Sequence, residues 1–254
     1  MTPDFYFVTL AVTAAAAAGL VGAFALMKRL ALAGDVISHI ALPGLGLAIL
    51  YGINPLLGGA ATLFLGIILA ANLEKKTGLT TDVVIGVIFA ASLALGALIT
   101  PEEELIEALF GGLGEVSAGE FFFGIGLGLV VAYSLWNMRH KLILGLFSGE
   151  LAQATKINLS RLNLRFLLVF GLAVILGLRF LGALLMGALI IIPAAAARQL
   201  THTLKLFLII SASLSVLSVV GGIALSQKYG LDLGPAVVVI ASLIFAASLL
   251  KKRN

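Results

Sequence analysis

Apolar stretches long enough to cross a bilayer follow one another along nearly the whole chain. Cutting the chain at charged clusters and turn residues leaves nine of them, at about residues 5–27, 31–51, 55–73, 82–100, 119–138, 164–179, 182–197, 205–226 and 235–250. A helix needs roughly 17–25 apolar residues to cross the hydrocarbon core. Only 11% of the 254 residues are charged, against about a quarter in soluble domains. The sequence therefore predicts an all-α, polytopic transmembrane helical bundle of about nine spans, with residues 1–254 forming one domain.

Charged residues separate onto the two sides of this bundle. The bases that fall on one side are Lys28, Arg29, Lys75, Lys76, Arg139, Lys141, Lys156, Arg161, Arg165, Arg198, Lys205 and Lys251 to Arg253. Only Arg179 and Lys228 fall on the other side, where most of the acidic residues collect. Because basic loops stay in the cytoplasm, we expect the N-terminus outside and the C-terminus inside a cytoplasmic membrane. The basic excess then reflects topology, and no nucleic-acid partner is expected.

The segment "LAGDVISHIALPGLG" places ionisable side chains inside the second apolar stretch. Asp35 and His39 are four residues apart, so they share one face of a helix. Pro43 follows four residues later, and its ring prevents the usual helical hydrogen bond to the carbonyl of His39. Ionisable groups and freed carbonyls are tolerated at this depth where they line a cavity or pair with each other. Two interpretations follow: a structural pair, or a polar path through the membrane, which the membrane setting favours.

The donor types at this segment suit a divalent transition metal. A carboxylate, an imidazole and a backbone carbonyl offer the nitrogen and oxygen ligands that Zn²⁺, Mn²⁺ and Fe²⁺ accept. The chain has no cysteine, which excludes thiolate sites and leaves His, Asp and Glu as ligands. His140 and His202 lie in basic cytoplasmic segments, where a solvated position is expected.

Two segments outside the spans carry helix signals. In "TPEEELIEALFGG", Pro101 precedes an acidic first turn, which predicts a short surface helix carrying Glu102, Glu103, Glu104 and Glu107. This helix could cap the bundle or dock a protein that delivers a substrate, and both interpretations stay open. In "IIIPAAAARQLTHTLK", the chain leaves a span at Pro193, and Leu200 and Leu204 form one face of a predicted short amphipathic helix with Arg198, His202 and Lys205 on another. That helix could contact a peripheral protein or lipid headgroups.

Several blocks, in order along the chain, match a known family. The stretch "LVGAFALMKRLALAGDVISHIALPGLGLA" follows a signature of Gly, Asp, two variable positions, Ser or Ala, His and then Pro-Gly. The later blocks are "TTDVVIGVIFAASLALGALI", "LFGGLGEVS" and "RFLGALLMGALIIIPAAAARQL". The chain thereby resembles the membrane permease subunits of ATP-binding-cassette importers for zinc, manganese and ferrous iron. One departure is Ala196, in a block that often reads Pro-Ala-Ala-Thr-Ala.

The resemblance implies a fold, partners and residue roles. It implies a single permease domain similar to the cobalamin-importer type, working as a homodimer in the bilayer over two cytoplasmic ATPase subunits and fed by an extracytoplasmic metal-binding protein. It implies that Asp35 and His39 are conduit residues and that Pro193–Lys205 is the helix coupled to the ATPase. No permanently bound cofactor is expected, since the metal is cargo. The chain lacks the phosphate-binding motif G-x-x-x-x-G-K-[ST], so ATP hydrolysis is expected in another chain.

The sequence also favours one metal and one class of transporter over the alternatives. If a twofold axis brought two Asp–His pairs together, they would supply two imidazoles and two carboxylates, a set that Zn²⁺ accepts as a tetrahedron. The block "RFLGALL", with its basic residue Arg179, also resembles the zinc members of the family. Zinc is therefore expected ahead of manganese or iron. The alternative is a proton-coupled secondary transporter. Such transporters often have duplicated halves with matching broken helices, whereas one broken segment is evident here. A purely structural subunit would leave the Asp–His pair unexplained.

Overall fold

The structure is a computed structural model, and it describes residues 5–30, 32–100, 116–147 and 155–250. These ranges are helical and contain no strand. The helices are α1 (Phe5–Met27), α2 (Ala33–His39), α3 (Leu42–Leu50), α4 (Pro55–Thr77), α5 (Thr81–Ile99), α7 (Ala118–Phe147), α9 (Leu159–Leu200), α10 (Leu204–Tyr229) and α11 (Leu233–Leu249). The predicted all-α helical bundle is therefore confirmed.

The predicted spans coincide with these helices. Among the described residues, eight helical stretches are long and apolar enough to cross a membrane, with α2 and α3 together forming one of them and α9 forming two. The ninth predicted span corresponds to α11, which is apolar but has only 17 residues. The helix at α7 is longer than predicted, with 30 residues, because it continues past its apolar part into the basic segment around Arg139.

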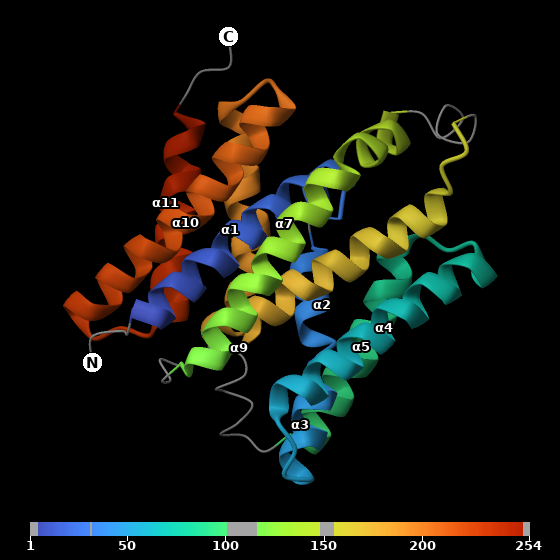
Figure 1. The fold of residues 1–254 in the computed structure, drawn as a ribbon, viewed down its shortest axis with the longest axis horizontal. Coiled ribbons are helices and arrows are strands. Elements are labelled where there is room, and N and C mark those ends of the chain that lie inside the picture. Colours follow the sequence, from blue (N-terminus) through green and yellow to red (C-terminus); the bar gives the residue numbers. More distant parts are fainter. Residues whose placement is uncertain (1–4, 31, 101–115, 148–154, 251–254) are drawn as a thin grey trace.

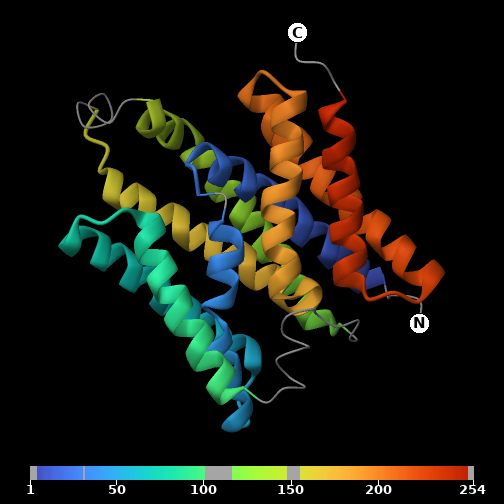
Figure 2. The same ribbon diagram turned by 180° about the vertical axis from the view of Figure 1, so that it is seen from behind.

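Local sequence signals fix several helix ends. Helix α4 begins after Asn54, whose side chain accepts a hydrogen bond from the backbone N–H of Leu56, and Pro55 stands at the first helical position. The same helix ends at Gly78, which has a left-handed φ of 67° that favours glycine. The boundary predicted between residues 179 and 182 lies at Gly182, where φ is 75° and ψ is 165°. The two halves of α9 run in different directions from that residue (Figures 1 and 2).

The core forms around α1 and the two halves of α9. Helix α1 is rich in alanine and contacts α7, α9 and α10, so its small side chains are buried on nearly every side. Helix α2 lies in the middle of the bundle and contacts α9 and α5, while α3 packs on α4 and α5 (Figure 1). The α3–α4 contact is close, because a Cβ atom on Gly44 would lie only 2.0 Å from the carbonyl oxygen of Gly58. This arrangement holds the broken segment α2–α3 inside the protein.

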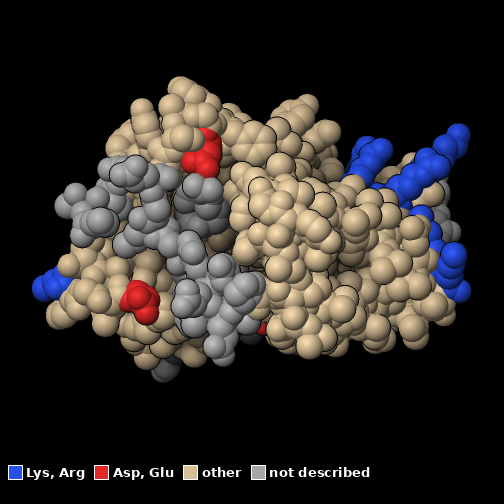
Figure 3. Space-filling model, turned by 90° about the horizontal axis from the view of Figure 1, so that it is seen from below, with Lys and Arg blue, Asp and Glu red and all other residues tan. Residues whose placement is uncertain are grey.

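Basic residues gather at one end of the helices. Lys75 and Lys76 lie in the last turn of α4, whereas Lys228 lies in the last turn of α10 at the other end. Figure 3 shows most of the Lys and Arg side chains in view at one end of the molecule, one basic patch at the opposite end, and the Asp and Glu side chains mainly towards that opposite half. The charge separation used for the orientation is thus present in the fold, while the sidedness in a membrane stays a prediction.

Two predicted surface helices have different outcomes. The acidic segment with Glu102, Glu103, Glu104 and Glu107 lies outside the described residues. The prediction that Pro193–Lys205 forms a separate short helix was wrong. Helix α9 continues through Pro193 to Leu200, and α10 begins at Leu204 after a short non-helical link. The alanine run explains the continuation, since alanine is the strongest helix former and favours extending α9.

Candidate functional site

The candidate site lies at the break between α2 and α3. The backbone N–H groups of Ile40 and Ala41 bond to Ile37 and Ser38, three residues back, at 3.2 and 3.4 Å. Pro43, near the start of α3, has no N–H, so it cannot donate to the carbonyl of His39. Helix α2 thus ends at His39, and α3 begins at Leu42. A short break of this kind inside a membrane span requires protein or a polar cavity around it.

His39 is held with one ring nitrogen committed and the other available. Its Nδ1 atom lies 2.7 Å from the backbone carbonyl oxygen of Asp35, so a neutral ring donates its Nδ1–H to that carbonyl. This tautomer leaves the lone pair of Nε2 unprotonated. Metal-binding histidines are commonly oriented by such a bond from the second ring nitrogen to a backbone carbonyl. The ring of Phe89 from α5 packs edge-on against the imidazole, with 5.6 Å between the ring centroids.

The Asp35 carboxylate makes no hydrogen bond to the His39 ring. The distance from Asp35 Oδ1 to His39 Nδ1 is 3.8 Å, which is too long for a hydrogen bond. The side chain of Asp35 is 46% exposed, whereas that of His39 is only 10% exposed. A half-exposed carboxylate within a membrane span must face water or a partner, because lipid tails cannot solvate it. This geometry favours a polar path over a closed structural pair.

Helix α9 supports this pair from the opposite side. The Ser38 hydroxyl lies 2.7 Å from the carbonyl oxygen of Asp35 and 3.0 Å from that of Ala183, just after the Gly182 turn. One helical turn further, a Cβ atom on Gly187 would lie 2.8 Å from Cα and 2.9 Å from Oδ1 of Asp35. Only glycine allows α9 to approach Asp35 this closely. Sequence reasoning assigned no role to Ser38, Gly187 or Phe89, although Ser38 stands within the quoted signature.

One chain offers few metal ligands at this site. In the described ranges, no three His, Cys, Asp or Glu side chains are grouped so as to hold a metal ion. One imidazole nitrogen and one carboxylate can bind a divalent cation weakly, which suits passage better than storage. Two such donors suit transient contact with a cation better than tight binding, and a tighter site would need ligands from elsewhere.

The residues expected to meet an ATPase lie at the basic end, away from the Asp–His pair. Arg198, near the end of α9, and His202, in the link to α10, are exposed, while Leu200 and Leu204 are half-buried and Pro193 is buried. The guanidinium carbon of Arg198 lies 6.0 Å from the ring centroid of Phe207 in α10. The link between α9 and α10 thus exposes polar groups, while the apolar residues beside it are partly or fully buried.

Comparison with known proteins gives consistent matches over nearly the full chain. The family described as the ABC 3 transport family matches residues 5–252. The high-affinity zinc uptake system membrane protein ZnuB of Haemophilus influenzae is 31% identical, over 92% of this chain and 91% of its own length. The manganese transport system membrane protein MntC of Halalkalibacterium halodurans is also 31% identical, over 90% and 80%. The solved structure of PsaBC from Streptococcus pneumoniae in complex with Fab has a TM-score of 0.84 at 24% identity, covering 97% and 91%, which shows a common fold.

Proposed function

This chain belongs to the ABC 3 transport family, and from that premise we propose that it moves Zn²⁺ into the cytoplasm, with Mn²⁺ or Fe²⁺ as the other candidate cargoes. It is the membrane permease subunit of an ABC importer for zinc or manganese and not the ATPase. Family membership displaces the alternative of a proton-coupled secondary transporter, because the energy source of this family is an ATPase.

One observation carries the proposal: the orientation of His39 beside a half-exposed Asp35. The Nδ1 bond to a backbone carbonyl leaves Nε2 free to bind a metal, and the Asp35 side chain is 46% exposed within a stretch of membrane-spanning length. Two copies related by a twofold axis would supply two nitrogen and two oxygen donors if the pairs met at the axis. Zn²⁺ accepts that set readily, whereas Mn²⁺ prefers more oxygen ligands. The relatives include both zinc and manganese proteins, so the zinc assignment rests on donor chemistry.

The proposal includes an assembly around this subunit. Two copies of the permease would sit over two ATPase subunits, and an extracytoplasmic metal-binding protein would deliver the ion. The end of α9, the exposed Arg198 and His202, and the start of α10 would receive the ATPase. The acidic segment with Glu102 and Glu107 is proposed to dock the delivery protein. Under this arrangement the basic end of the bundle faces the cytoplasm.

A metal add-back experiment tests the cargo. A strain in which this gene is deleted would be grown in chelated medium, and Zn²⁺, Mn²⁺ or Fe²⁺ would be added back singly over a concentration series. We expect growth to return only with added zinc, and a plasmid copy of the gene to lower the zinc concentration that is needed. Rescue by traces of manganese, with no more than the ordinary zinc requirement, would overturn the zinc assignment while leaving the permease function in place.

A further inference from the structure

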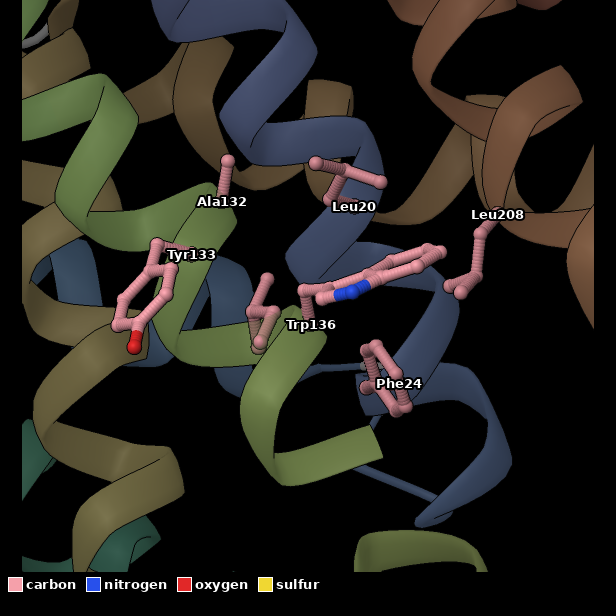
Figure 4. A pocket seen from close by; sticks show the side chains of 7 residues that line it. Leu20, Phe24, Ala132, Tyr133, Trp136 and Leu208 are labelled. Carbon is pink, nitrogen blue, oxygen red and sulfur yellow. The ribbon is translucent and has the colours of Figure 1, made fainter. Parts of the chain in front are cut away.

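An apolar pocket opens on the surface between α1, α7 and α10. Its volume is about 330 Å³, and it is lined by Leu20 and Phe24 of α1, Tyr133 and Trp136 of α7, and Leu208 of α10, among others. In Figure 4 the indole of Trp136 reaches from α7 towards Leu208, with Leu20 and Phe24 on either side of it. Nothing in the proposed transport path uses this pocket, because the Asp–His pair lies on α2 between α5 and α9.

The pocket is placed to meet lipid. Tyr133 is 71% exposed and Trp136 is 57% exposed, although both belong to a helix of membrane-spanning length. Exposed apolar surface on a membrane-spanning helix meets acyl chains wherever no other protein covers it. Tryptophan and tyrosine are enriched where the apolar core of a membrane meets its headgroups. A hollow lined by aliphatic and aromatic side chains at this level therefore fits a hydrocarbon chain.

Basic residues lie near the lining residues along each of the three helices that form the pocket. The guanidinium carbon of Arg139 lies 3.9 Å from the ring centroid of Trp136, which places Arg139 at the rim. Arg29 follows α1 shortly after Phe24, and Lys205 precedes Leu208 by about one turn in α10; both are exposed. Lys141 adds a further exposed base on α7. In their described parts, these ends of the three helices carry no Asp or Glu.

We propose that this pocket binds an anionic phospholipid, with one acyl chain between α1, α7 and α10 and the phosphate at Arg139, Arg29 and Lys205. Basic pockets between membrane helices recognise anionic headgroups by charge. Arg139 is oriented by its stacking on Trp136 and by a hydrogen bond from its guanidinium to the Trp136 carbonyl. This arrangement holds a cation at the mouth of the hollow. A second copy of the chain fits less well, because the rim offers bases and no carboxylate to pair with them.

Lipid binding to the purified protein is the test. The detergent-solubilised protein would be delipidated and titrated with phosphatidylglycerol or phosphatidylcholine, and bound lipid would be counted by native mass spectrometry. We expect preferential binding of phosphatidylglycerol, and we expect Arg139→Gln to reduce the preference about fivefold, the factor for one basic residue near an anionic lipid. Lys228→Gln removes a base that also lies over an aromatic ring, 5.4 Å from the Tyr229 centroid, but at the other end of α10, and should change nothing.

Further variants separate the chain site from the headgroup site. Ala132 also lines the hollow, so Ala132→Phe fills it and should reduce binding of both lipids. Lys205→Gln should lower the preference for phosphatidylglycerol as Arg139→Gln does, and it serves as the second charge variant in case Arg139→Gln alters folding. Equal affinity of the wild type for the two lipids, or a full preference retained in both charge variants, would overturn the proposal. Because the chain has no native cysteine, Tyr133→Cys provides a direct check on a protein occupant. A disulfide-linked dimer through this position in membranes would also overturn the proposal.

Discussion

At the scale of single residues, the site depends on contacts between residues that are far apart in the sequence. The Asp–His pair and the helix break at Pro43 could be predicted, because they depend on neighbours within one short segment. The contacts of Ser38 with Ala183 and of Asp35 with Gly187 could not, because about 150 residues separate the partners along the chain. Small residues in "GALLMGALI" hinted at close packing but did not identify the partner helix.

The Gly187 contact gives a direct prediction. Gly187→Ala places a methyl group 2.8 Å from the Cα atom of Asp35, so α9 must move away from α2. We expect a loss of about 1–3 kcal/mol in the free energy of unfolding, as for other overpacked sites. Gly126→Ala is the matched control, since nothing lies within 4 Å of a Cβ atom there. Thermal unfolding followed by the fluorescence of Trp136, the only tryptophan, measures both. Equal midpoints for the two variants would contradict the packing described.

A second residue-scale prediction concerns Lys28, which lies just beyond α1. Burial lowers the pKa of its ammonium group, and the nearby Glu74 carboxylate partly offsets that effect. Asn163 donates a hydrogen bond of 3.3 Å to Glu74, and a glutamine could still accept it. Glu74→Gln should therefore destabilise the protein mainly by leaving the Lys28 charge uncompensated.

The sign of the pH dependence follows from the lowered pKa of Lys28. In the variant, the cost of the buried charge is complete below the pKa in the folded state and fades as the pH rises towards the ordinary lysine value of 10.5. The gap in unfolding temperature between wild type and Glu74→Gln should be largest near about pH 7 and shrink towards about pH 10. Asp82→Asn, at an exposed acid of α5, should show no such trend. A gap that stays constant with pH would rule out Lys28 as the cause.

At the scale of helices, apolar length predicted where each helix lies, but not how helices continue. The turn at Gly182 was marked in the sequence only by glycines and Arg179, whose side chain lies outside the described part of the structure. The continuation of α9 through Pro193 was not predicted, because proline usually ends or kinks a helix. Here the alanine run after Pro193 and burial against the bundle favour a continued helix.

The link between α9 and α10 carries the prediction at this scale. Arg198→Glu reverses an exposed charge beside the proposed ATPase contact and should reduce recovery of the ATPase with the permease several-fold, since a misplaced charge disfavours docking. Lys228→Glu is the matched control, because Lys228 is also exposed and also lies over an aromatic ring, at the opposite end of α10. Pull-down of the ATPase from membranes measures both variants. If both retained the ATPase equally, the contact would have to lie elsewhere.

At the scale of the whole molecule, composition alone predicted a membrane-spanning helical bundle, and the charge distribution predicted its orientation. The way the spans enclose α2 could not be predicted, because in a mostly apolar chain the hydrophobic pattern does not distinguish lipid-facing from protein-facing sides. Close approaches such as Gly44 on Gly58 decide that arrangement. The outcome is a half-exposed carboxylate and a buried imidazole held within one bundle, which is the basis of the proposed transport path.

Metal uptake by conduit variants tests this account most directly. Cells lacking the native gene would express wild type, Asp35→Asn or His39→Ala at matched membrane levels, with Asp82→Asn and His140→Ala as controls that make the same chemical changes at exposed positions. The account predicts that uptake of radiolabelled zinc falls about tenfold or more in each conduit variant, while both controls transport as the wild type does. Wild-type uptake by Asp35→Asn and His39→Ala would contradict the claim that metal passes through this pair.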